Sequence, residues 1–219
     1  MFRRDSPDGD DVEAQRAALV DRLVETGRIE REATAEAMRA VPRHEFVPES
    51  RRDAAYADRP LPIGADQTVS APHMVGIMCD HLALEPGDEV LEIGAGCGYH
   101  AAVTTEIVGD GNVYSVEYVD RLAREARGRL ADLSYDVHVR VGDGHEGWPE
   151  HAPYDAAYLT CAAASVPDPV VDQLRAGGRL VAPIGTTSQR LVTVTKTPAG
   201  PEREEHGAVR FVPMQGGES

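Results

Sequence analysis

Apolar positions along this chain follow two different spacings, and the order of these spacings predicts an α/β fold. In residues 12–26 and 31–40 they recur every three or four residues, the period of a helix with one buried face. From residue 74 onward, short apolar runs alternate with helical patterns. The expected strands are 89–93, 112–117, 137–141, 154–160, 179–183, 190–197 and 208–213, and the expected helices among them are 74–82, 99–108, 120–133 and 166–174. This alternation implies parallel βαβ units, so we expect a doubly wound, mostly parallel, Rossmann-like sheet with an N-terminal helical segment.

The stretch between the N-terminal helices and the sheet has no sustained period. Residues 42–72 contain five prolines, and they are expected to form a long loop, which inside a compact domain is usually functional. We therefore expect one domain over residues 12–219. Residues 12–72 would carry the helices and a substrate loop, and residues 73–219 the ligand-binding core and C-terminal strands. Residues 1–11 are polar and acidic and are expected to be a flexible tail.

The charge of the chain is strongly negative. Asp and Glu number 37 against 22 Lys and Arg, a formal net charge of -15, and Lys196 is the single lysine. Such a composition is expected of a halophilic protein, because concentrated salt screens the self-repulsion; an ordinary acidic cytosolic protein is the alternative. The negative field argues against a nucleic-acid partner, since phosphate contacts need cationic patches.

The cysteines and the apolar runs indicate the compartment. Cys79, Cys97 and Cys161 show neither CxxC nor Cys/His spacing, so no disulfide framework and no metal site are expected. Residues 1–11 lack the apolar core of a signal peptide, and no run approaches the roughly 18 apolar residues that suggest a membrane span. We expect a cytoplasmic monomer with no membrane partner.

A glycine-rich turn joins an expected strand to an expected helix in residues 90–99. The turn has the spacing GxGxG and is preceded by Glu92, whereas dinucleotide-binding proteins favour GxGxxG. A ligand with cationic groups is bound better by a carboxylate and backbone carbonyls than an anionic pyrophosphate would be. In the alternative interpretation the glycines only close a tight connection between strand and helix. The candidate binding residues here are Glu92, Gly94, Ala95, Gly96 and Gly98.

Acidic residues also follow the next two expected strands. Glu117 lies 23 residues beyond Gly94, near the interval at which a carboxylate binds ribose hydroxyls, and Asp143-Gly144 follows the strand 137–141. Each has an ordinary alternative, a solvated strand end for Glu117 and a common Asp-Gly turn for Asp143. Because parallel strands end at the same edge of a sheet, we expect the three carboxylates to share one binding site.

Eight segments of the chain together match the sequence pattern of one enzyme family: 56–64, 67–74, 91–99, 142–148, 152–155, 167–174, 179–185 and 211–214. On these segments the chain resembles the protein-L-isoaspartate O-methyltransferase family, from about residue 41 to residue 214. The Thr-x-Ser-x-Pro segment at 68–72 and the Phe-Val-Pro tail at 211–213 distinguish this family from other methyltransferases. Cys97, His100 and Cys161 depart from its usual residues without removing a group that the chemistry needs.

The resemblance implies a class I methyltransferase fold and transfer of a methyl group from S-adenosylmethionine to the α-carboxylate of L-isoaspartyl residues in damaged proteins. A carboxylate has a reference pKa near 4 and is already ionised, so no general base is needed, and catalysis comes mainly from alignment. Ser70 is implied to contact the reacting carboxylate, with Thr68 beside it, and Val212 to offer a backbone contact. From the residues alone, Thr68 and Ser70 could instead cap the helix that begins near Pro72.

Other functions remain as alternatives. A methyltransferase with a different acceptor would keep the same cofactor residues, and a binding module could hold the cofactor without turnover. A nicotinamide dehydrogenase is disfavoured by the GxGxG spacing.

Overall fold

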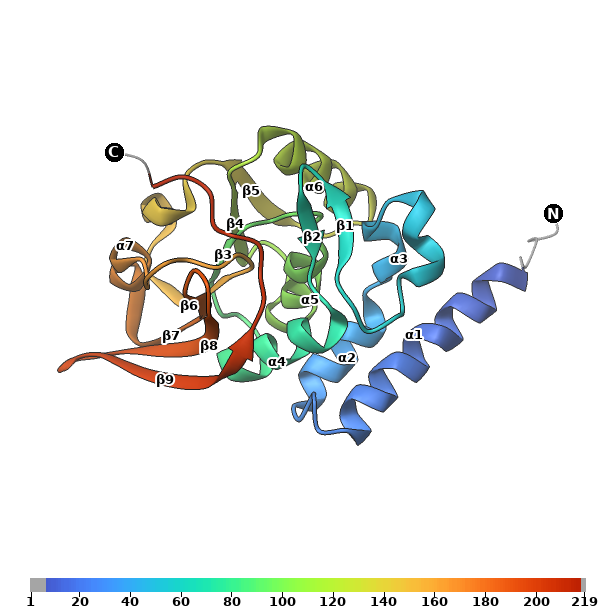
Figure 1. Ribbon diagram of the computed structural model, residues 1–219, viewed down its shortest axis with the longest axis horizontal. Helices are drawn as coiled ribbons and strands as arrows, with labels where there is room; N and C mark the ends of the chain where they lie inside the picture. The colour runs from blue at the N-terminus through green and yellow to red at the C-terminus, as the bar shows by residue number, and fades with distance from the viewer. Residues whose placement is uncertain (1–6, 218–219) are drawn as a thin grey trace.

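A seven-stranded sheet runs through the centre of the molecule in the order β5-β4-β3-β6-β7-β8-β9. It belongs to a computed structural model that describes residues 7–217 (Figure 1). The strands of this sheet are β3 (Val90–Ile93), β4 (Val113–Glu117), β5 (Val137–Val141), β6 (Tyr154–Leu159), β7 (Leu174–Ile184), β8 (Gln189–Thr197) and β9 (Gly200–Val209). Five neighbouring strands, β5 to β7 in sheet order, are parallel, and β8 and β9 continue the sheet as an antiparallel hairpin. The expected doubly wound, mostly parallel sheet is confirmed, and its strand order reverses at β3.

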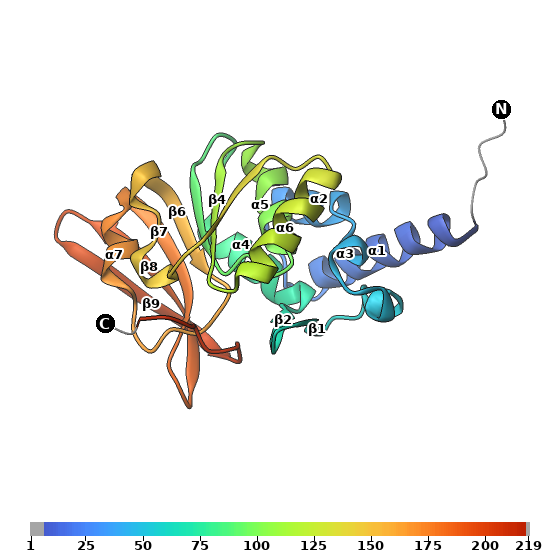
Figure 2. The same ribbon diagram turned by 90° about the horizontal axis from the view of Figure 1, so that it is seen from above.

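Helices cover both faces of this sheet because successive strand residues point to opposite sides. Val90 and Val113 pack on one face with α4 (Pro72–Leu82), α5 (Tyr99–Val108) and α6 (Asp120–Asp132). Leu91 and Val116 pack on the other face with α7 (Asp168–Asp172), near the short 3-10 turns η2 (Gly144–Glu146) and η3 (Pro149–His151). Figure 2 shows the sheet between these two layers.

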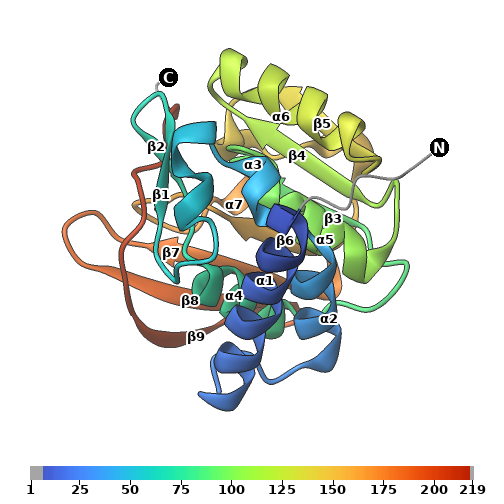
Figure 3. The same ribbon diagram turned by 90° about the vertical axis from the view of Figure 1, so that its right-hand side faces the viewer.

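The N-terminal helices extend the layer that contains α5. α2 (Glu32–Ala40) contacts α5, and α1 (Pro7–Glu25) contacts α2, so that α1 lies far from β9 (Figures 1 and 2). Figure 3 views the molecule from the side of α1, with α2 and α5 behind it. The expected tail at residues 1–11 is wrong for residues 7–11, where α1 has already begun; residues 1–6 lie outside the described part of the chain. None of the helices described between residues 7 and 217 is long and apolar enough to cross a membrane.

Residues 42–72 are not the long loop that their irregular pattern predicted. They form α3 (Arg43–Phe46), the 3-10 helix η1 (Glu49–Ala54) and a hairpin of β1 (Leu61–Gly64) and β2 (Gln67–Val69). Elements of three to six residues are too short to produce a visible period, and the hairpin turn uses Ala65 and Asp66, both at positive φ, rather than a typical turn pair. We call residues 55–70, which end in this hairpin, the acceptor segment.

Two C-terminal boundaries also differ from the expectation. The last strand is β9, at 200–209 instead of 208–213, because a polar edge strand such as β9 has no apolar run to mark it. The helix expected at 166–174 is the shorter α7, and Leu174 already belongs to β7.

Candidate active site

The glycine-rich turn after β3 shapes the floor of the site. Gly94, Gly96 and Gly98 all have positive φ, a region that L side chains rarely adopt. A Cβ atom at Gly94 would lie 2.3 Å from the Thr160 hydroxyl oxygen, and one at Gly98 would lie 3.1 Å from the Leu130 side chain. Gly94 therefore allows a close approach within the site, whereas Gly98 allows α5 to pack on α6.

Glu117, the last residue of β4, holds this turn in place. Its carboxylate accepts hydrogen bonds from the backbone N–H groups of Gly96 and Val119, both at 2.9 Å. Glu117 also lines the cleft above the turn. The sequence correctly placed this carboxylate at the strand edge beside the glycines.

Glu92 does not share the cleft with Glu117, contrary to the expectation of one site with three carboxylates. It is fully buried beneath the turn, where the hydroxyls of Ser115 and Tyr158 donate to its two carboxylate oxygens. Burial raises the pKa of Glu92 to about 7, and the two hydroxyl donors offset part of this rise. The reason is strand alternation: Glu92 lies on the same face as Val90, under α5, while Ile93 points toward the cleft.

Asp143 lies at the edge of the cleft and binds the end of the chain. Its carboxylate accepts from the backbone and the ring of His145 and, at 2.6 Å, from the backbone N–H of Gly217. Burial by itself would raise the pKa of Asp143, but the Gly217 and His145 donors outweigh it and lower the pKa below its ordinary value. Its neighbour Gly144 lines the cleft itself.

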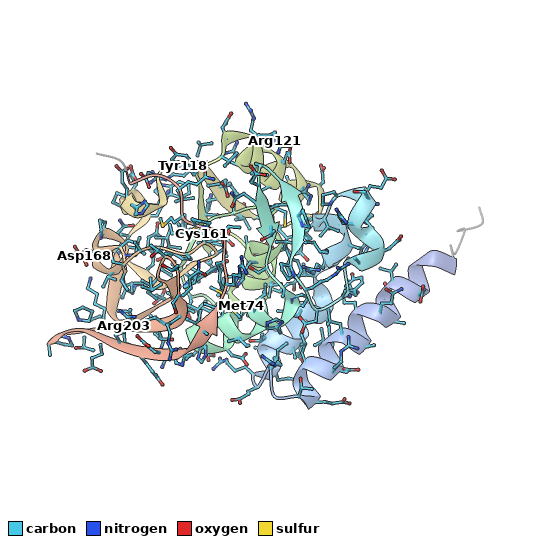
Figure 4. The ribbon with its side chains drawn as sticks, in the orientation of Figure 1. Met74, Tyr118, Arg121, Cys161, Asp168 and Arg203 are labelled. Carbon is cyan, nitrogen blue, oxygen red and sulfur yellow. The ribbon has the colours of Figure 1, made fainter. Side chains whose placement is uncertain are left out.

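Three hollows meet around the β1–β2 hairpin. The sheet-edge cleft lies over Gly94, Gly96 and Glu117 and is narrow, with a cavity volume of about 50 Å³. The hairpin groove runs between Ser70 and residues 208–212, and the inner pocket lies under the hairpin, with Ala95 in its wall. Figure 4 labels Tyr118 and Cys161 in the cleft and Met74 in the groove.

Thr68 and Thr160 line all three hollows. Ser70 lines the groove and the inner pocket, and Val212 lines the cleft and the groove. Their common position is therefore the junction between the cleft and the groove. The residues that resemblance assigned to the acceptor are brought together here.

Ser70 does not cap the helix that follows it. The residue before α4 is Ala71, and no side chain caps this helix. The Ser70 hydroxyl makes no hydrogen bond to another group within residues 7–217, whereas its carbonyl accepts from Arg43 at 3.0 Å. The capping alternative is wrong, and the hydroxyl faces the hollows.

Thr160 is a site residue that the sequence analysis missed. Its hydroxyl lies 2.6 Å from the carbonyl oxygen of Gly94 and donates to it, so the Thr160 oxygen can only accept from a ligand. The available signal was its position: Thr160 directly follows β6, at the same edge of the sheet where Glu117 ends β4.

Two segments cover the sheet-edge cleft. From the hairpin, Ile63 approaches Gly96, where an added Cβ would lie 3.3 Å from the Ile63 side chain. From the other side, residues 212–217 cross the cleft; Val212 O accepts from Ala162 N at 2.8 Å, and Gly217 is held by Asp143. A ligand in the cleft would therefore lie between the hairpin and the C-terminal segment.

A parallel sheet whose order reverses at β3, with a GxGxG turn and a strand-end carboxylate at that point, defines a Rossmann-like α/β protein of the S-adenosylmethionine-dependent methyltransferase class.

Comparisons with known proteins identify the family within this class. The family model described as protein-L-isoaspartate(D-aspartate) O-methyltransferase (PCMT) matches residues 14–219. Protein-L-isoaspartate O-methyltransferase 2 of Archaeoglobus fulgidus is 52% identical over 209 residues, which cover 94% of this chain and 95% of the relative. The Methanopyrus kandleri protein-L-isoaspartate O-methyltransferase is 51% identical over 93% of this chain and 92% of its own. The chain belongs to the protein-L-isoaspartate(D-aspartate) O-methyltransferase family.

Solved structures agree with this assignment. A protein-L-isoaspartate O-methyltransferase structure superimposes with a TM-score of 0.85 at 30% identity, covering 92% of this chain and 66% of that one. A Plasmodium falciparum structure in complex with S-adenosyl-L-homocysteine has the same fold, with a TM-score of 0.81 at 23% identity over 91% of this chain and 98% of that one.

Proposed function

We propose that this protein is a repair enzyme that transfers a methyl group from S-adenosylmethionine to the α-carboxylate of L-isoaspartyl residues in damaged proteins. The observation that carries the proposal is the junction at Thr68 and Thr160, where the sheet-edge cleft meets the hairpin groove. A methyl donor held in the cleft and a peptide carboxylate held in the groove would meet there. The names of the relatives, at about half identity over nearly the whole chain, support the same acceptor.

The residues that line the cleft have the chemistry that S-adenosylmethionine needs, and this donor would supply the methyl group when bound. Glu117 would accept hydrogen bonds from the ribose hydroxyls, and Asp143 with Gly144 would receive the adenine amino group. Ile93 from the sheet and Met214 from the C-terminal segment would offer apolar contacts to the adenine ring. The turn at Gly94–Gly98 would let the backbone approach the amino acid end of the donor.

On the acceptor side, the hydroxyls of Ser70 and Thr68 would orient the carboxylate by donating hydrogen bonds to it. Neither group adds a full positive charge that would reduce the nucleophilicity of the oxygen. Val212 would offer its backbone to the peptide. Because an isoaspartyl carboxylate is ionised near neutral pH, these residues need only align it, and no proton has to be removed.

We also infer a setting for this activity. The three thiols, Cys79, Cys97 and Cys161, are free, which supports a reducing cytoplasm. The net charge of -15 with a single lysine supports work at high salt, as a monomer that does not bind nucleic acid.

The test is a methylation assay with radiolabelled S-adenosylmethionine, run in dilute buffer and in molar salt. The acceptors are a short isoaspartyl peptide and its aspartyl twin. Base-labile label on the isoaspartyl peptide alone is the expected result. If S-adenosylhomocysteine binds but neither peptide is labelled in either buffer, the acceptor assignment is wrong while the cofactor assignment stands.

A further inference from the structure

Arg43 is a fully buried arginine that pairs with no carboxylate in the described part of the chain. It is the first residue of α3 and is 0% exposed. Burial lowers the pKa of its guanidinium, a direction that reflects the loss of water around the charge. A buried cation without an ionic partner is costly to the fold, so its hydrogen-bond partners indicate what it contributes.

All of those partners belong to the acceptor segment, residues 55–70. The guanidinium donates to the carbonyl oxygens of Ala55, Arg59 and Ser70, the last at 3.0 Å. The planar guanidinium thus holds both ends of the segment, at Ala55 and Ser70, and one position between them, at Arg59. The rigid fork of arginine suits this task, because its N–H groups point in fixed directions.

Arg43 also contacts the cofactor side of the site. Its guanidinium carbon lies 5.5 Å from the ring centroid of Tyr99, which directly follows the glycine-rich turn as the first residue of α5. A cation over an aromatic face at this distance is attractive. Arg43 therefore joins the segment that carries Ser70 to the start of the helix that follows Gly98.

We infer that Arg43 is a positioning residue for the methyl acceptor: by holding the Ser70 carbonyl it sets the Ser70 hydroxyl at the junction of cleft and groove. Arg43 lines none of the three hollows, so its charge does not contact the reacting oxygen. From behind the Ser70 carbonyl it adds a positive potential that favours binding of the acceptor carboxylate. In a protein of net charge -15, such a potential offsets repulsion of an anionic acceptor. The identity of the acceptor in this inference rests on the proposed function, whereas the contacts of Arg43 do not depend on it.

The test compares Arg43→Met, which removes the charge and the donors, with Arg43→Lys, which keeps the charge but not the fork. For Arg43→Met we expect kcat/KM for the isoaspartyl peptide to fall about 100-fold, while the dissociation constant of S-adenosylhomocysteine changes less than about threefold. Arg43→Lys should recover at least about tenfold of that loss, mainly through KM. If Arg43→Met does not fold, Arg43→Lys alone tests the inference, because its kcat/KM for the isoaspartyl peptide should still fall below that of the wild type while its affinity for S-adenosylhomocysteine does not.

Phe46→Ala serves as the matched control for lost stability, because Phe46 is equally buried on the same helix and packs against Tyr99. If Phe46→Ala lowers kcat/KM as much as Arg43→Met at equal loss of stability, or if cofactor affinity falls in parallel with activity, the inference is wrong.

Hydrogen exchange separates the inference from the proposed function. Backbone amides of residues 55–70 should exchange faster in Arg43→Met than in Phe46→Ala, with no substrate present. If the wild-type protein methylates no isoaspartyl peptide but this difference is seen, the positioning role stands and the proposed acceptor falls. If residues 55–70 exchange alike in both variants, the positioning role falls.

Discussion

The Oε2 atom of Glu117 accepts a hydrogen bond from the backbone N–H of Gly96 at 2.9 Å. This bond joins the end of one parallel strand to the glycine-rich turn that follows its neighbour. It places a carboxylate in the cleft while keeping the turn in one conformation.

Replacing Glu117 by Gln should weaken cofactor binding. The N–H groups of Gly96 and Val119 bind different oxygens of the carboxylate. In Gln one of these oxygens is replaced by an NH2 group that cannot accept, and the side chain carries no charge for the ribose hydroxyls. We expect the dissociation constant of S-adenosylhomocysteine to rise about 10- to 100-fold by calorimetry. The exposed Glu150→Gln makes the same chemical change outside the cleft and should bind as wild type. Equal affinity in the two variants would contradict the assignment of Glu117.

Replacing Ser70 by Ala should reduce turnover without affecting the cofactor. The hydroxyl makes no bond within the described chain, so its loss removes only an interaction with the acceptor. We expect kcat for the isoaspartyl peptide to fall about 10- to 100-fold, with S-adenosylhomocysteine affinity unchanged. Ser188→Ala, in an exposed turn, is the matched control. A variant with wild-type kcat would remove Ser70 from the acceptor site.

Replacing Glu92 by Gln should stabilise the protein at alkaline pH. The folded-state pKa of Glu92 is raised to about 7 by burial, from an ordinary value of 4.5. Between these values the folded form keeps a proton that the unfolded form has lost, so the contribution of Glu92 to stability falls as pH rises from 4.5 to about 7. Chemical unfolding near pH 8 should show Glu92→Gln more stable by about 2 kcal/mol, with little difference near pH 5.

The same variant tests the cofactor role first expected for Glu92. Because the side chain lies behind the turn, we expect S-adenosylhomocysteine to bind Glu92→Gln within about threefold of wild type. The control is Glu202→Gln, on the exposed edge of the sheet, which should bind as the wild type does. A hundredfold loss of S-adenosylhomocysteine affinity in Glu92→Gln alone would mean that the Glu92 carboxylate contributes to ligand binding.

Arg210 should influence which isoaspartyl sites are methylated. It is exposed, lines the hairpin groove, and forms no ion pair in the described part of the chain; no acidic residue lines this groove. Arg210→Glu should lower kcat/KM about 3- to 10-fold more for a peptide with Glu beside the isoaspartate than for one with Lys, an effect that salt should weaken. Arg203→Glu, on β9 away from the groove (Figure 4), should not discriminate between the peptides.

Salt should stabilise the fold. The net charge of -15 repels itself, and added ions screen this repulsion. We expect the melting temperature to rise by at least about 5 °C between dilute buffer and molar KCl. A melting temperature that stays constant or falls would contradict the halophilic interpretation.

The βαβ core was predictable from the sequence because its signals are local. A buried strand that runs into Gly94 and Gly96, and a carboxylate at the end of the following strand, are properties of short segments, and parallel strands must end at one edge. The fold class, the glycine-rich turn and the place of Glu117 followed from these signals. The acceptor role proposed for Thr68 and Ser70 came from resemblance, since a Thr-x-Ser-x-Pro segment alone is also typical of a helix start.

Tertiary structure decided the features that depend on long-range contacts. Only the packed sheet shows that alternation buries Glu92 under α5, that Thr160 shares all three hollows with Thr68, and that Gly217 returns to Asp143 across 74 residues. The three bonds from Arg43 to the acceptor segment also span 12 to 27 residues. Such contacts follow from how elements pack together, and no local period or motif in the sequence encodes them.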